Sequence, residues 1–191
     1  MSIIVCPGIH EPKLTENFVS AWRELFVLYF PATSSVNVLI LPTAGFYCLS
    51  GLHILQFLQA HLQNNLRSPL TFISFSAGVV GAIAAAHLWQ MFAGEVKAFI
   101  AIDGWGVPLW ANFPIHRMSH DYFTHWSSKT LGCGQNNFYA DPAVTHLDMW
   151  RSPQTVMGWW VDSPTEGQSQ LQKRLSAAEF LCMLLMRYEN N

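Results

Sequence analysis

Short apolar runs alternate with helix-like patterns along the first hundred residues, and this alternation limits the possible folds more than any other feature. The apolar runs predict strands, and the three- and four-residue spacing of apolar side chains between them predicts helices. The expected strands are 3–5, 36–41, 70–75 and 96–102, and the expected helices are 14–29, 51–66 and 78–92. Strands that alternate with helices build βαβ units, whose right-handed crossovers place helices on both faces of a mostly parallel sheet. The sequence therefore predicts a three-layer α/β architecture.

The second half of the chain lacks this regularity. Between 104 and 135, aromatic and histidine side chains lie among turn residues without a clean period, so we expect an aromatic-rich insertion or lid after the fourth strand. A short strand at 137–140 and an amphipathic helix at 171–188 follow. The expected fold is a single domain over residues 1–191, built on a sheet of about five to six strands.

Composition excludes several classes of protein. Hydrophobic residues make up 51% of the 191 residues and charged residues 12%, which excludes a disordered chain. The formal net charge is −2 and no basic run occurs, so we expect no nucleic-acid partner. The four cysteines are far apart in the sequence, as is typical of reduced thiols in a cytoplasmic protein.

The longest uncharged stretch, residues 70–94, does not have the character of a membrane span. A span needs about 20 mostly apolar residues in one helix. Here a strand-like segment comes first, and serine, glycine, histidine and glutamine side chains interrupt the rest. The first residues of the chain are typical of a strand rather than of a signal peptide. We therefore predict no transmembrane segment and a cytoplasmic location.

Two chemically suggestive segments are predicted to meet at one edge of the sheet. In the common strand order 2-1-3-4-5, the ligand crevice lies between the carboxyl ends of strands one and three. Those two ends are residues 7–10 and residues 74–78. We expect a functional site where these segments approach each other.

The segment from Ser74 to Gly78 joins the third strand to a helix. Small residues on both sides of Ser76 leave room for a strained turn that exposes the serine hydroxyl at a helix N-terminus. The segment resembles the nucleophile elbow of the α/β-hydrolase superfamily, Gly-x-Ser-x-Gly, although Ser74 stands in place of the first glycine. This resemblance covers the chain to about residue 103, and it implies an α/β-hydrolase-like fold with Ser76 as nucleophile. The structural alternative is a serine- and glycine-rich turn that only packs a tight strand–helix joint.

An acyl-transfer site needs two donors for the oxygen of the tetrahedral intermediate. The N–H of Ala77, directly after the candidate nucleophile, is the first expected donor. The resemblance places the second donor in the loop after an earlier strand, where Gly8 permits a sharp turn and either Ile9 or His10 could present an N–H. An ordinary strand-end turn explains this loop equally well, and His10 is alternatively a substrate contact.

A serine hydroxyl also needs a base, and the base needs an orienting acid. The superfamily has the chain order nucleophile, acid, histidine, with the histidine after the final strand. His146 fits this order, since it follows the last predicted strand. Asp103 ends the fourth strand and is the favoured acid, because some lipases place the acid after the strand that follows the nucleophile's helix. Asp141 is the rival acid.

These residues lead to the hypothesis of a serine hydrolase that cleaves a small, hydrophobic acyl ester or thioester. Six aromatic residues in the irregular segment suggest an apolar cover or acyl pocket: Trp105, Trp110, Phe113, Tyr122, Phe123 and Trp126. No nucleotide-binding motif follows any strand, so no cofactor is predicted.

Other interpretations remain. His116, His120 and His125, with Asp121, could in principle ligate a metal, but their irregular context favours solvated or packed side chains, and no metal is predicted. The main functional alternative is a catalytically inactive binding or scaffold protein on the same fold. The missing first glycine favours this alternative, as does the apparent lack of a strand between the fourth and the last. A flavodoxin-like ligand-binding domain is a third possibility.

Overall fold

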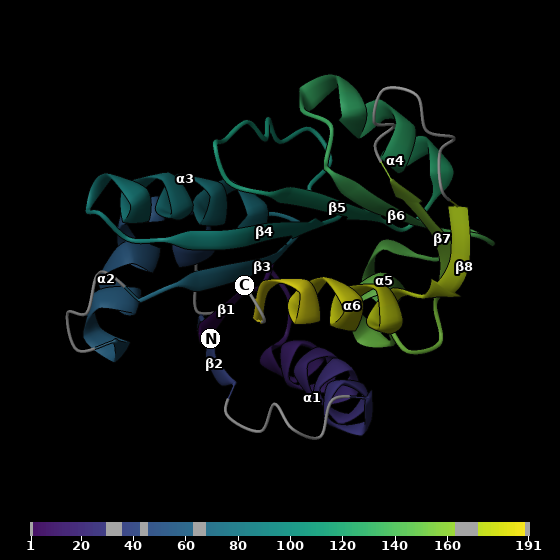
Figure 1. The fold of residues 1–191 in the computed structure, drawn as a ribbon, viewed down its shortest axis with the longest axis horizontal. Helices are drawn as coiled ribbons and strands as arrows, with labels where there is room; N and C mark the ends of the chain where they lie inside the picture. Colours follow the sequence, from purple (N-terminus) through teal and green to yellow (C-terminus); the bar gives the residue numbers. More distant parts are fainter. Residues whose placement is uncertain (1, 30–35, 43–45, 63–67, 163–171, 190–191) are drawn as a thin grey trace.

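The computed structural model describes residues 2–29, 36–42, 46–62, 68–162 and 172–189, which form helices around one central sheet (Figure 1). The strands are β1 (Ser2–Cys6), β2 (Asn37–Ile40), β3 (Leu70–Phe75), β4 (Val96–Ile102), β5 (Ile115–Ser119), β6 (Asn136–Ala140), β7 (Met157–Asp162) and β8 (Gln172–Ser176). The α-helices are α1 (Pro12–Tyr29), α2 (Gly51–His61), α3 (Gly78–Met91), α4 (Tyr122–Ser128), α5 (His146–Arg151) and α6 (Ala177–Glu189). Two short 3-10 helices are η1 (Tyr47–Leu49) and η2 (Lys129–Leu131).

All described strands belong to one sheet with the order β2-β1-β3-β4-β5-β6-β7-β8. The strands from β2 to β6 run parallel, and β7 and β8 are added antiparallel. The start of this order agrees with the predicted 2-1-3-4. The prediction of five to six strands was too low, because the described residues alone form eight strands of the sheet.

Helices cover both faces of the sheet, as the alternating pattern predicts. Figure 1 shows α2, α3 and α4 on one side of the sheet and α1, α5 and α6 on the other. Side chains of β3 alternate between two cores: Ile73 and Phe75 pack with α1 and α6, whereas Leu70 and Phe72 pack with α2 and α3. Because both faces are buried, the central strands are nearly continuous apolar runs in the sequence.

The segment 104–135, predicted to be an irregular insertion, instead contributes β5 to the sheet as well as α4. All five residues of β5 are buried, yet three carry polar side chains, and the two largest of these bond to partners within the fold. His116 Nε2 lies 2.8 Å from the hydroxyl of Tyr188, and the guanidinium of Arg117 donates to the carbonyl oxygens of Val107 and Gly132. Because partners inside the fold satisfy these polar groups, the strand needs no apolar run that a sequence pattern could reveal.

The last predicted helix begins later than expected. Residues 172–176 form the edge strand β8, and the helix begins at Ala177. The first three residues of β8 are exposed, and two of them, Lys173 and Arg174, are charged. Charged side chains are common on edge strands, where they discourage pairing with other chains. The helix pattern was therefore extended over a strand that buries little apolar surface.

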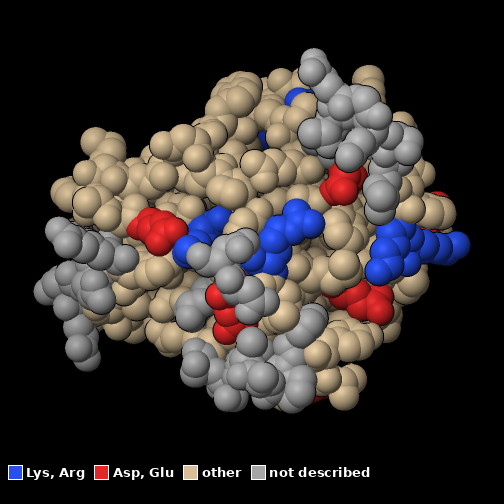
Figure 2. All heavy atoms as spheres, in the orientation of Figure 1, with Lys and Arg blue, Asp and Glu red and all other residues tan. Residues whose placement is uncertain are grey.

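The surface carries few charges. On the face shown in Figure 2, basic and acidic side chains are interspersed among a largely uncharged surface, in keeping with the low fraction of charged residues. In the part of the chain that the structure describes, no helix is both long and apolar enough to cross a membrane.

Candidate active site

Four neighbouring parallel strands each supply one polar residue at or beyond their carboxyl ends. Ser76 follows β3, Asp103 follows β4, His120 follows β5, and His146 follows β6 as the first residue of α5. Since parallel strands end at the same edge of a sheet, these four side chains converge although they span 71 positions of the chain.

The turn between β3 and α3 places Ser76 in a strained conformation. Ser76 has φ = 53°, in the left-handed region that costs a non-glycine residue roughly 1–2 kcal/mol. Its N–H donates to the carbonyl oxygen of Ile102, which anchors the turn to β4. A Cβ atom at Gly78 would overlap the carbonyl oxygen of Pro7, so glycine is required there. At the position of the missing first glycine, Ser74 is buried and its hydroxyl donates to the carbonyl oxygen of Ile100.

The predicted nucleophile, base and acid form one chain of hydrogen bonds. His146 Nε2 lies 2.9 Å from Ser76 Oγ, and His146 Nδ1 lies 2.9 Å from Asp103 Oδ2. A carboxylate only accepts, so Nδ1 carries the proton and Nε2 is free to accept from the serine hydroxyl. The ring of Phe75 stacks against the imidazole with centroids 4.6 Å apart, which fixes the plane of the base.

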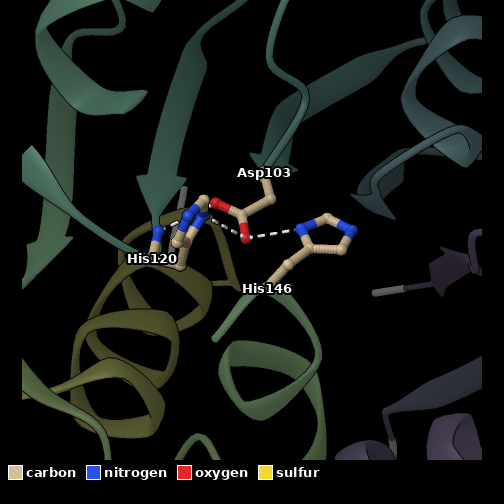
Figure 3. A group of neighbouring side chains, drawn as sticks. All are labelled: Asp103, His120 and His146. Carbon is tan, nitrogen blue, oxygen red and sulfur yellow. Dashed lines mark hydrogen bonds and ion pairs between the residues drawn. The ribbon is translucent and has the colours of Figure 1, made fainter. Parts of the chain in front are cut away.

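Asp103 is almost completely enclosed, and its carboxylate accepts three hydrogen bonds. Its side chain is 1% exposed and its backbone is left-handed, with φ = 51°. Oδ1 accepts from the backbone N–H of His120 at 2.8 Å, and Oδ2 accepts from the imidazoles of both His120 and His146 (Figure 3). Burial by itself raises the pKa of this carboxyl group, but the hydrogen bonds from the two histidines outweigh burial and hold the pKa below its usual value.

His120 is a site residue that the sequence analysis considered only as a possible metal ligand and not as a partner of the catalytic residues. Its Nδ1 lies 3.0 Å from Asp103 Oδ2, and its Nε2 lies 3.6 Å from Asp121 Oδ2. The hydrogen bond to Asp103 raises the pKa of His120, and the charges of the two carboxylates add to this effect although partial burial opposes it. The sequence signal that could have found it is its place directly after β5, and that strand itself was missed.

The rival acid, Asp141, has a different partner. Its carboxylate accepts from the indole N–H of Trp159 at 2.8 Å and is exposed. None of the hydrogen bonds among the described residues joins Asp141 to His146. Of the two candidate acids, the geometry therefore places Asp103 beside the imidazole.

The loop after β1, in which the sequence predicted an oxyanion donor, lies against the turn that carries Ser76. A Cβ atom at Gly8 would come within 3.0 Å of the Ser76 Cβ atom. The N–H of Ala77 has no acceptor among the described residues, which suits it to a developing anion. The side chain of Ile9 is exposed.

The imidazole of His10 contacts residues of α1, β3 and α5. His10 Nε2 lies 2.9 Å from Thr15 Oγ1, and the ring packs edge-on against Phe75 and Trp150. Burial lowers the pKa of His10, and the nearby charge of His146 lowers it further. His10 does not line the cleft beside Ser76.

A cleft of about 470 Å³ opens beside Ser76 toward α4. Its lining residues are Ser76, Ala77, Val80, Asp103, Trp105, Val107, His120, Asp121, Phe123, Thr124 and His146. Of the six aromatic residues predicted to form a cover, Trp105 and Phe123 line this cleft. Phe113 is instead buried in the core with α3, and Trp110, Tyr122 and Trp126 are exposed without lining the cleft.

Asp103, His120 and His146 are also near enough to one another to approach a single ion, since one ligand atom from each lies within 4.8 Å of the others. In the structure both Nδ1 atoms are directed at the same carboxylate oxygen (Figure 3). Hydrogen bonding accounts for this cluster, and the absence of a metal stays a prediction.

Comparison with known proteins does not assign the chain to a family. No protein-family model matches it, and no curated protein sequence is significantly similar to it.

Proposed function

We propose that the protein is a serine hydrolase that cleaves a hydrophobic acyl ester or thioester. The observation that carries this proposal is the hydrogen-bonded chain from Ser76 through His146 to Asp103, with both contacts at 2.9 Å. Nucleophile, base and orienting acid within hydrogen-bond reach are the recognised arrangement for acyl transfer, whatever the fold.

In the proposed reaction, Ser76 Oγ attacks the carbonyl carbon of the substrate while His146 Nε2 takes the hydroxyl proton. Asp103 stabilises the imidazolium that forms and keeps its ring in position. The imidazolium then donates its proton to the departing alcohol or thiol, which leaves Ser76 acylated. A water molecule attacks this acyl-enzyme and gives a proton to His146, and collapse of the second intermediate releases the acid and restores the serine hydroxyl.

The negative oxygen of each tetrahedral intermediate needs donors that are already in place. The N–H of Ala77 is the first proposed donor, at the start of α3, where free N–H groups and the helix dipole both favour an anion. The second proposed donor is a backbone N–H of Ile9 or His10. The close approach of Gly8 to Ser76 supports this role for the loop.

The walls of the cleft support an apolar substrate. Val80, Val107, Trp105 and Phe123 line the space next to Ser76, and its volume of about 470 Å³ suits a small molecule. The carboxylate of Asp121 also lines the cleft, and it would repel a substrate whose acyl group carries negative charge. We therefore propose an uncharged acyl group as the preferred substrate portion.

A fluorophosphonate probe tests the proposal, because it forms a stable bond only with an activated serine. We expect wild-type protein to be labelled at Ser76, as read by mass spectrometry, and to hydrolyse short-chain nitrophenyl esters even with a metal chelator present. Ser76→Ala and His146→Ala should show neither labelling nor turnover, whereas Ser20→Ala, which alters an exposed serine on α1, should behave as wild type. A wild-type protein without labelling or turnover would contradict the proposal and leave a binding protein as the better hypothesis.

A further inference from the structure

The Asp103 carboxylate accepts hydrogen bonds from two imidazoles, those of His146 and His120. His120 has no part in the reaction proposed above. We propose that His120 is a positioning residue that holds the Asp103 carboxylate aimed at His146 and thereby sets the pH range in which His146 acts as a base. This inference rests on the proposed function of Ser76, His146 and Asp103.

The contact between His120 and Asp103 has two points. The backbone N–H of His120 donates to Oδ1 at 2.8 Å, and its imidazole Nδ1 donates to Oδ2 at 3.0 Å. Two bonds from one residue to both oxygens fix the plane of the carboxylate, which then directs Oδ2 at His146 (Figure 3). His120 directly follows the buried strand β5, so this clamp is attached to a rigid part of the sheet.

The surroundings of the His120 side chain differ from those of His116, a structural histidine within the preceding strand β5. His116 is fully buried, bonds to Tyr188, and has its pKa lowered to about 3 by burial and by the nearby Arg187. His120 is 25% exposed and lines the cleft beside Ser76. A histidine that only filled space in the core would not need to reach the cleft.

Charge around His120 favours its protonated form. Asp103 and Asp121 lie on two sides of its ring, and the only nearby imidazole in contact with it among the described residues is His146, with ring centroids 6.0 Å apart. Beyond His146 lies His10, whose own pKa is lowered. The hydrogen bond to Asp103 and the charges of the two carboxylates raise the pKa of His120 and so favour a positive charge beside Asp103.

A cation on the far side of Asp103 weakens the hold of that carboxylate on a protonated His146. With the cation present, Asp103 therefore stabilises a protonated base less than it would alone. Loss of the cation should move the acid limb of kcat/KM upward by about one pH unit. Loss of the hydrogen bond should reduce kcat about 10- to 100-fold, the usual effect of removing a group that orients a functional side chain.

Two substitutions separate these effects. His120→Ala removes both the side-chain donor and the charge, whereas His120→Asn can place an amide N–H where Nδ1 lies but carries no charge. His61→Ala is the matched control, since His61 is exposed on α2 and, within the described part of the chain, both its hydrogen bond and its ring contact are with Phe57. The measurements are fluorophosphonate labelling and pH profiles of nitrophenyl ester hydrolysis between about pH 5 and pH 9.

We expect the His120→Ala variant to lose kcat and to shift its acid limb upward, the His120→Asn variant to recover most of kcat but keep the shift, and the His61→Ala variant to match wild type. An active wild type with unchanged profiles in both His120 variants would overturn the inference and leave the proposed function intact. A slower His120→Ala enzyme with no pH shift and no recovery in His120→Asn would also overturn it, because that outcome indicates a structural role alone. If the alanine variant does not fold, the pH profile of His120→Asn decides by itself. Absence of labelling and turnover in wild type would instead refute the proposed function, and the inference with it.

Discussion

The ends of β3 and β4 form two corners with the same backbone conformation and opposite surroundings. Ser76 and Asp103 are both left-handed, with φ = 53° and φ = 51°. The corner at Ser76 leads straight into α3 and leaves the side chain half-buried beside the cleft, whereas the corner at Asp103 leads into a loop and encloses the carboxylate. Strain of the same kind thus presents a hydroxyl in one place and buries an acid in the other.

The packing behind the two corners differs as well. A Cβ atom at Gly78, two residues after Ser76, would meet the backbone carbonyl oxygens of Pro7 and Cys6. A Cβ atom at Gly104, one residue after Asp103, would meet side-chain atoms of Val79, the nearest at 2.8 Å. A side chain can rotate away but a backbone carbonyl cannot, so the corner at Ser76 is the less adaptable of the two.

The largest expected effect tests whether the enclosed corner supplies the acid. Asp103→Asn should lower kcat for ester hydrolysis about 10⁴-fold, because a neutral amide neither fixes the imidazole tautomer nor stabilises the imidazolium. Asp141→Asn is the matched control: an amide oxygen can still accept from Trp159, so kcat should stay within about twofold of wild type. A greater loss in Asp141→Asn than in Asp103→Asn would show that the rival acid is the functional one.

The next effect concerns the two glycines. Gly78→Ala should lower the free energy of unfolding by about 3 kcal/mol, since a methyl group there overlaps backbone carbonyls that cannot move independently. Gly104→Ala should cost about 1 kcal/mol, because Val79 can adjust its side chain. Urea unfolding of both variants measures the difference, and equal losses would mean that the two corners are equally adaptable.

A smaller expected effect is the change in stability when the backbone strain at Ser76 is relieved. Ser76→Gly should be more stable than Ser76→Ala by about 1 kcal/mol, since glycine adopts the left-handed conformation without a steric penalty. Ala93, which follows α3 with φ = 63°, is a left-handed residue outside the site, and Ala93→Gly should stabilise the protein by about the same amount. The midpoints of urea unfolding measure these differences. If Ala93→Gly is more stable than wild type but Ser76→Gly is no more stable than Ser76→Ala, the backbone at Ser76 is not strained in the ordinary way.

The smallest expected effect is on the pH dependence of the free energy of unfolding. It should differ between substitutions at Asp103 and at Ser76. The lowered pKa of Asp103 contributes stability that is present above about pH 4, its value in an unfolded chain, and is lost as the pH falls. The raised pKa of His120 contributes stability that is present below about pH 6.5 and is lost as the pH rises through its folded value. The stability advantage of wild type over Asp103→Asn should therefore be largest between these limits. Unfolding of Ser76→Ala over the same pH range should follow the wild-type curve, and a flat difference for Asp103→Asn would contradict the linkage.

Much of the candidate site could be predicted because each residue is tied to a recognisable strand end. Ser76 and Asp103 directly follow β3 and β4, whose apolar residues matched the predicted bounds 70–75 and 96–102. His146 follows β6 by only a few residues. Once strands are parallel neighbours, their carboxyl ends must meet, so residues far apart in the chain could be grouped without coordinates.

His120 could not be predicted because the strand that carries it has no apolar signature. His116 in β5 finds its partner in Tyr188, 72 residues away in the sequence, and that contact replaces apolar burial. The edge strand β8 was not predicted either. Its charged residues are exposed and it buries little apolar surface, so it also lacks an apolar run. Of the six aromatic residues that were expected to cover the site, only Trp105 and Phe123 line the cleft, and the sequence did not indicate which ones would do so.

By itself, the sequence determined the α/β alternation, the start of the strand order, and three polar residues at strand ends, because apolar periodicity directly reflects which side chains a sheet must bury. Only the tertiary structure decided that Asp103 rather than Asp141 contacts His146, that β5 enters the sheet, and that His120 shares the carboxylate. Those outcomes depend on hydrogen bonds between polar groups far apart in the chain, and such partners leave no periodic trace in the local sequence.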